Sequence, residues 1–178
     1  MIERQLSSLK HVLLLVFISI CLNCCTKTSD PILFKMEYDQ ILNIPAGLNT
    51  IETYSFLVKD IPSNYRYLLT TFNFTDTTIT TIKPGSIRLI DELGLIDFSR
   101  VEKISLIASQ SGYTNEKEIG YLELVPLTST NTLQLFPTLV NAKDIFSKET
   151  FNLKLKIKLR NFLNTSANIR LRFNMNAN

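Results

Sequence analysis

Carboxylates are the side chains of this sequence whose spacing is suited to chemistry. They form two groups: Asp91, Glu92 and Asp97, and then Glu116, Glu118 and Glu123. Two carboxylates facing each other across a cleft hydrolyse glycosidic bonds, and several together bind Ca²⁺. The first group lacks the alternating ligands of a calcium loop. Both groups are also typical of solvated turns between strands, which is the interpretation the sequence favours.

Histidine and cysteine chemistry is confined to the start of the chain. The single histidine, His11, and the three cysteines, Cys21, Cys24 and Cys25, all precede residue 26. Removal of a leader ending near residue 24 leaves no histidine and one cysteine, which excludes Ser-His-Asp triads and histidine-based zinc sites. The scattered glycines form no phosphate-binding loop. We therefore expect no enzyme, no catalytic residue, no metal site and no cofactor.

Cations alternate with apolar residues near the C-terminus. The six are Lys154, Lys156, Lys158, Arg160, Arg170 and Arg172. If 151–159 and 169–175 pair as a hairpin, all six share one outer sheet face and would dock an anionic partner, either an acidic glycan, lipid phosphates or an acidic protein. The alternative is a solvated face or an edge protected by lysine. The net charge of +3 is too small to indicate nucleic acid as a partner.

Tyrosines beside a turn are a second candidate binding feature. Tyr65 and Tyr67 follow Pro62-Ser63-Asn64. An aromatic ring with a polar edge suits the rim of a sugar site, although a tyrosine on a sheet loop is also ordinary packing. The sequence thus adds a glycan to the candidate ligands.

The first residues have the features of a secretory signal. An apolar run, 12–22, follows the basic residues Arg4 and Lys10. These 11 residues are too few for a membrane-spanning helix, which needs about 20. They match the apolar region of a signal peptide, which has about 7–15 residues.

The sequence Leu22-Asn23-Cys24-Cys25 resembles the lipobox of bacterial lipoproteins. The resemblance implies cleavage before Cys25 and lipidation of that residue, with Cys24 as the alternative. Cys24 departs from the small Gly, Ala or Ser usual at its position. We therefore expect a signal peptide at 1–24 and a tether at 25–30. Thr26 in place of an aspartate favours the outer membrane, and both periplasmic and surface-facing placements stay open.

The elements that position these residues are strands. Residues 151–159 and 169–175 alternate strictly between apolar and polar or charged side chains, the pattern of half-buried strands. Further strands are expected at 32–38, 51–58, 66–74, 78–82, 86–90, 101–108, 119–124 and 133–136, and one connecting helix at 140–148. Their spacing predicts an all-β domain over 31–178, a single antiparallel β-sandwich of immunoglobulin-like or jelly-roll-like type with at most one short helix.

The domain also resembles small β-rich lipoproteins of uncertain function from Bacteroidetes. The resemblance starts at 44–54, continues through 86–108 and includes the two terminal alternating strands. It implies a lipid-anchored protein of the cell envelope. We expect a non-enzymatic interaction or structural module that binds an envelope protein or a glycan and contacts the membrane through its N-terminal lipid. The alternatives are a carboxylate-dependent glycan hydrolase and an accessory lipoprotein of an envelope transport or secretion complex.

Overall fold

The computed structural model describes residues 31–113, 115–129 and 131–178 of the chain. The expected signal peptide 1–24, the tether 25–30 and the lipidation residue Cys25, or its alternative Cys24, lie outside the described residues. Residues 32–178 form a unit of their own by their internal contacts. Within the described part, no helix is both long and apolar enough to cross a membrane.

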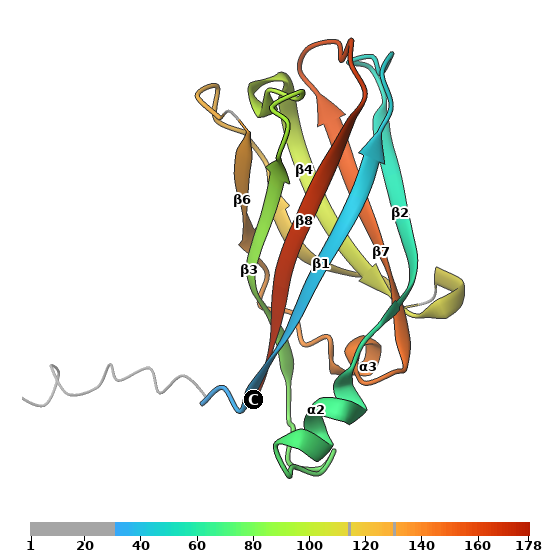
Figure 1. Ribbon diagram of the computed structural model, residues 1–178, viewed down its shortest axis with the longest axis vertical. Coiled ribbons are helices and arrows are strands. Elements are labelled where there is room, and N and C mark those ends of the chain that lie inside the picture. The colour runs from blue at the N-terminus through green and yellow to red at the C-terminus, as the bar shows by residue number, and fades with distance from the viewer. Residues whose placement is uncertain (1–30, 114, 130) are drawn as a thin grey trace, which may run out of the picture. The chain divides into compact units, whose positions relative to one another are not determined.

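Eight antiparallel strands build the domain (Figure 1). They are β1 (Phe34–Ile44), β2 (Thr53–Pro62), β3 (Ile82–Asp91), β4 (Val101–Ser109), β5 (Lys117–Leu122), β6 (Thr132–Pro137), β7 (Thr150–Leu159) and β8 (Ala167–Ala177). They hydrogen-bond in the order β1-β8-β3-β6-β5-β4-β7-β2. The all-β prediction is confirmed.

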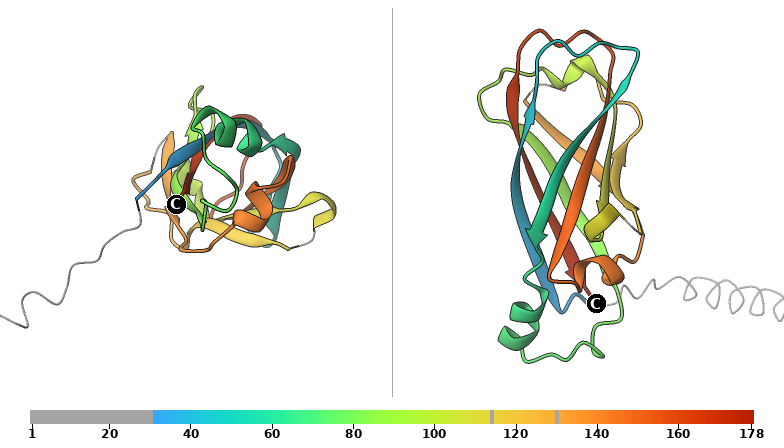
Figure 2. Two further views of the ribbon diagram at one scale, coloured as in Figure 1. Left: turned by 90° about the horizontal axis from the view of Figure 1, so that it is seen from below. Right: turned by 90° about the vertical axis from the view of Figure 1, so that its right-hand side faces the viewer.

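The strands belong to one sheet that curls until its outer strands, β1 and β2, approach each other. Seen along the strands, they surround a common interior, with the short helices at one end (Figure 2). The arrangement is barrel-like rather than the two separate sheets of a sandwich. The interior is filled by side chains, as expected for eight strands. One apolar cluster includes Met36, Leu89, Leu106, Leu155 and Leu171.

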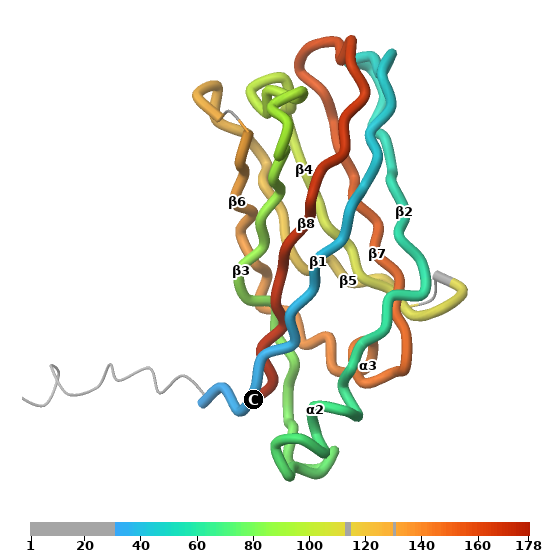
Figure 3. The backbone as a smooth tube through the Cα atoms, viewed as in Figure 1, coloured from blue at the N-terminus to red at the C-terminus, as the bar shows by residue number. Residues whose placement is uncertain are grey.

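The expected hairpin of the last two strands is wrong. β7 pairs with β2 and β4, whereas β8 pairs with β1 and β3. Figure 3 follows the chain from β7 through the connection 160–166 to β8 on another part of the sheet. Their apolar faces meet across the interior, where the rings of Phe151 and Phe173 lie 6.4 Å apart. Their charged faces therefore point away from each other.

A helix replaces the strand expected at 66–74. Helix α2 (Tyr65–Thr71) begins after Asn64, which has a left-handed φ of 57°. Tyr65 is buried, and Leu68 and Leu69 pack partly against the core. This is the i, i+3, i+4 spacing of a helix, which overrides the high strand propensity of the tyrosines and threonines. With α3 (Lys143–Phe146), the described domain has two short α-helices, one more than expected.

The threonine-rich stretch expected to be an edge strand at 78–82 forms turns instead. The hydroxyl of Thr75 hydrogen-bonds those of Thr77 and Thr78, and the amide of Thr78 donates to the carbonyl of Thr75. Only Ile82 belongs to a strand. Threonine hydroxyls compete with sheet pairing when they bond locally in this way.

Candidate docking surface

Four connections between strands lie at one end of the domain. They are 45–52, 92–100, 123–129 and 160–166, and we call them the loop platform. Figure 1 shows them at the top, opposite the start of β1, the end of β8 and the two α-helices. The described chain therefore enters and leaves the domain at the end away from the loop platform.

Backbone hydrogen bonds join the first and last loops of the platform. Leu48 and Leu163 form a β-bridge. The amide of Gly47 donates to the carbonyl of Leu163 at 2.8 Å, and the amide of Leu163 donates to the carbonyl of Leu48 at 3.2 Å. Gly47 has a φ of 84°, a conformation that favours glycine. The two loops thus form one continuous surface.

Arg160 joins three loops. Its amide donates to the carbonyl of Arg100 at 2.7 Å. Its guanidinium donates to the carbonyls of Ser99 at 2.7 Å and Val125 at 3.0 Å. A planar guanidinium is suited to holding several carbonyls in fixed directions. Arg160 is therefore a positioning residue of the loop platform and is not free to bind an anionic partner.

Asp91 shapes the loop 92–100 from within. Its side chain is fully buried and accepts hydrogen bonds from the amides of Leu93, at 3.1 Å, and Ile96. A carboxylate that accepts backbone amides satisfies donors which would otherwise be buried without a partner. Asp91 thus turns the chain so that Leu93 and Leu95 are exposed while Ile96 is buried.

Asp97 lies in the same loop, directly before its final 3₁₀ turn. Its carboxylate accepts from the amide of Ser99 at 2.9 Å and caps the 3₁₀ turn Phe98–Arg100. The hydrogen bonds from Ser99 lower the pKa of Asp97 below its usual value. Glu92 forms an ion pair with Arg170 at 2.5 Å. All three acids of the first group therefore have structural partners.

Large apolar side chains are exposed in every loop of the platform. They are Ile51, Leu93, Leu95, Leu124, Leu127 and Phe162, with exposures from 46% to 86%. Single exposed apolar residues are ordinary, but a group of them on one end marks a surface that another molecule covers. Because hydrogen bonds hold the four loops together, this surface is formed before anything binds.

The charge of the loop platform is low and slightly acidic. Its four loops contain no lysine, four acids and two arginines. The acids are Glu52, Glu92, Asp97 and Glu123. Both arginines donate to backbone carbonyls, Arg160 as above and Arg100 to Phe162 at 3.1 Å. The platform thus lacks the free cations that attract proteins to anionic lipid surfaces.

The structure divides the six C-terminal cations among β7, β8 and, for Arg160, the loop platform. Lys154 pairs with Glu116, and Lys158 pairs with Glu102 at 3.2 Å. On β8, Arg170 and Arg172 both contact Asp39, at 3.4 and 3.0 Å. The expected single patch does not form, because the two strands are not neighbours.

Lys156 differs from the other cations of β7. It lies opposite Ser55 on β2 and Ser105 on β4. It also borders a hollow of about 330 Å³ that Lys103 and Lys158 share. Lys103 contacts Glu123 at 2.6 Å, and this hydrogen bond raises its pKa. Acids therefore balance two of the three lysines around this hollow.

The other expected binding residues are also spread out. In the second acidic group, Glu118 accepts from the hydroxyl of Ser105, while Glu116 and Glu123 form the ion pairs given above. Tyr65 is buried and donates to Asp76 at 2.7 Å, whereas Tyr67 is 71% exposed. The described residues contain no group of three or more histidine, cysteine, aspartate or glutamate side chains placed to hold a metal.

Sequence reasoning did not identify the loop platform. Leu124 was assigned to the strand expected at 119–124, but β5 ends at Leu122. The available signal was the turn residues Gly94 and Pro126, which lie between exposed leucines. An apolar residue beside such a turn does not belong to the buried face of a strand, so its side chain is left exposed. Comparison of the sequence with protein-family models and with curated proteins finds no match.

Proposed function

We propose that this chain is a lipid-anchored interaction module of the bacterial cell envelope, and that it docks a partner protein through the loop platform. The observation that carries the proposal is the group of six exposed apolar side chains on four loops that hydrogen bonds hold together. The buried core of a protein interface is apolar, and a preformed surface loses less conformational entropy when a partner binds.

The position of the loop platform suits a partner beyond the anchoring membrane. A lipid on Cys25 would hold the chain at its N-terminal side, and the described domain begins at the end opposite the loops. The 11 residues of β1 extend over about 35 Å. The acidic excess also disfavours an anionic lipid surface as the occupant. A protein with an apolar patch and a basic rim would complement both the exposed apolar side chains and the acidic excess of the loop platform.

The accessory subunit of an envelope complex is the alternative that this surface favours. Such a subunit needs a stable apolar contact with its neighbours, and exposed apolar loops provide one. The carboxylate hydrolase has less support, because Asp91, Glu92 and Asp97 hold the loop 92–100 and its neighbours in place.

Photo-cross-linking in intact cells of a Gram-negative host tests the docking surface. A photoreactive amino acid at Leu127 and, separately, at Ile51 is expected to capture the same partner, since both residues belong to one surface. Leu93→Asp, in a third loop, should abolish both cross-links. The matched control places the probe at Leu139, which is 91% exposed but lies outside the loop platform. Two different partners, or cross-links that survive Leu93→Asp, would contradict a single docking surface.

Intact mass tests the anchor separately. The protein isolated from membranes should have the mass of residues 25–178 plus acyl groups, and Cys25→Ala should lack them. An unmodified chain, or one cut elsewhere, would remove the membrane anchor from the proposal and leave the docking surface to be judged on the cross-links.

A further inference from the structure

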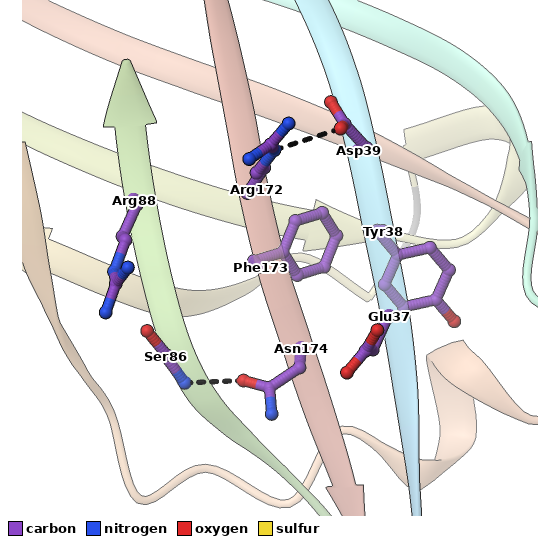
Figure 4. Close-up of a pocket in the computed structure, with 8 residues that line it drawn as sticks. All are labelled: Glu37, Tyr38, Asp39, Ser86, Arg88, Arg172, Phe173 and Asn174. Carbon is purple, nitrogen blue, oxygen red and sulfur yellow. Dashed lines mark hydrogen bonds and ion pairs between the residues drawn. The ribbon is translucent and has the colours of Figure 1, made fainter. Parts of the chain in front are cut away.

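Four polar side chains form a row across the outer face of β1, β8, β3 and β6. Asp39, Arg172, Arg88 and Gln134 are successive partners in the strand registers. Figure 4 shows Arg172 and Arg88 on neighbouring strands, with Asp39 on the far side of Arg172. The row belongs to the sheet wall and is separate from the loop platform.

The two arginines of this row are register partners on the neighbouring strands β3 and β8, and no acid lies between them in the register. Like charges opposite each other on a sheet are unfavourable. Each guanidinium is held at Nε, Arg172 by Asp39 at 3.0 Å and Arg88 by Gln134 at 3.1 Å. Among the described residues, the terminal nitrogens of Arg88 have no partner. Figure 4 shows the guanidinium of Arg172 turned toward Asp39 and that of Arg88 turned the other way. Each guanidinium is therefore suited by itself to a bidentate contact with an oxyanion.

A hollow of about 500 Å³ lies over this row. Glu37, Ser86 and Asn174 line it together with the two arginines. A β-bulge at Gly85 and Ser86 widens β3 here, and the amide of Ser86 donates to Oδ1 of Asn174 at 2.6 Å. Asn174 thus satisfies a backbone donor that the bulge takes out of the ladder. The hollow therefore has a hydrogen-bonded wall at this position.

A second hollow of about 390 Å³ adjoins the first, because Glu37 lines both. Lys35, Asn64 and Tyr67 are its other polar or aromatic residues. Tyr67 offers most of its ring to solvent. The carboxylate of Glu37 has no partner in the described part of the chain. From Lys35 to Asp39 the two hollows follow about 13 Å of β1, more than an inorganic ion fills.

We propose that the two hollows form one groove that binds an acidic polysaccharide bearing carboxylate groups. Arg88 and Arg172 each pair with a uronate carboxylate, Glu37 accepts hydrogen bonds from sugar hydroxyls, and Tyr67 stacks on a sugar ring. A peptide is a poorer occupant, since peptide docking needs deep apolar pockets for anchor side chains, and the only large apolar or aromatic side chains of the lining that are not buried are Tyr67 and the half-buried Leu68. The proposal does not depend on the loop platform.

Calorimetry of the full chain tests the groove. The chain is kept in a polyoxyethylene detergent, which has no sugar head group, and titrated with hexagalacturonate, maltohexaose and inorganic phosphate. We expect binding of hexagalacturonate that weakens as salt rises, with little or no heat from the other two probes. No binding of hexagalacturonate, equal binding of maltohexaose, or full competition by phosphate would overturn the proposal.

Matched variants locate the binding. Arg88→Gln and Tyr67→Ala should each weaken binding at least about tenfold, and Arg88→Lys should weaken it too, because lysine lacks the planar fork. Lys156→Gln and Phe136→Ala remove a cation and an exposed ring outside the groove and should leave the affinity unchanged. Unchanged thermal unfolding of every variant excludes a folding defect. If the groove variants bind like the wild type, the site lies elsewhere and the proposal fails.

Discussion

The amide of Arg160 donates to the carbonyl of Arg100 at 2.7 Å and so joins two loops that are far apart in the sequence. The guanidinium of Arg160 then reaches the carbonyls of Ser99 and Val125. One residue directly after β7 therefore fixes three of the four loops that display the exposed apolar side chains. The positions of Leu93, Leu124 and Phe162 relative to one another depend on this arrangement.

Arg160→Ala should destabilise the domain and loosen the loop platform. It removes two hydrogen bonds from a charged donor to backbone carbonyls, which together contribute about 1–3 kcal/mol. Urea unfolding should show this loss, and hydrogen exchange should rise in 92–100 and 123–129. Arg66→Ala is the matched control, because within the described residues the side chain of Arg66 forms only an exposed ion pair with Glu149, worth less than about 1 kcal/mol. Equal effects of the two variants would contradict the role given to Arg160.

Asp91→Ala should be more damaging than Asp91→Asn. Alanine leaves the amides of Leu93 and Ile96 without their acceptor, at a cost of about 2–4 kcal/mol. Asparagine keeps one acceptor oxygen and should lose about half as much. Urea unfolding of the wild type and the two variants gives the order of their stabilities. If the two variants are equally stable, the hydrogen bonds to Asp91 are not what holds this loop.

Acid should loosen the loop 92–100 through Asp97. Hydrogen bonds from Ser99 lower the pKa of Asp97 in the folded chain, so the ionised carboxylate stabilises the fold above its unfolded pKa of about 3.9. This contribution is lost as the pH falls from there through the lower folded pKa. Asp97→Asn keeps a capping oxygen and has no carboxylate to titrate.

The stability difference between wild type and Asp97→Asn should therefore change as the pH falls below about 4 and be constant from pH 5 to pH 7. Urea unfolding across this range measures it, and carboxyl NMR shifts report the pKa of Asp97 directly. A titration of Asp97 at or above its usual value would contradict the cap.

Gly85→Ala should destabilise the bulge on β3. A Cβ at this position would lie 2.5 Å from Oδ1 of Asn174, which holds the amide of Ser86. The cost is about 1–3 kcal/mol, and it should fall when Asn174→Ala is already present. Thermal unfolding of the two single variants and the double variant gives a double-mutant cycle, which measures the coupling between the two positions. Additive effects would show that Asn174 is not the group that excludes a side chain here.

The sequence predicted which apolar residues of β7 and β8 are buried, but it placed the buried Asn152 outside and did not predict which strands these two pair with. Alternation depends only on the backbone geometry of one strand, so the apolar faces of 151–159 and 169–175 were identified correctly. Pairing depends on the path of the connection 160–166, which crosses to another part of the sheet. This is why the six cations were placed on one face, whereas three lie on β7, two on β8 and Arg160 in the loop platform.

Local spacing explains the remaining differences. Tyr65, Leu68 and Leu69 have helical spacing, but strand-forming residues around them favoured a strand interpretation. The loop platform has no periodic signal at all, because its exposed leucines stand singly beside turns. Arg88 was not singled out, since its importance comes from lying opposite Arg172 across β3 and β8.

Hydroxyl-radical footprinting compares the exposed side chains of the loop platform in the intact envelope and in the purified full chain. Labelling of Ile51, Leu93, Leu127 and Phe162 should be high in the purified protein and strongly reduced in the envelope. Leu139, which lies between β6 and α3 and outside the loop platform, should be labelled equally in both. Equal labelling of the loop platform in both states would show that nothing covers it, and would contradict its role as a docking surface.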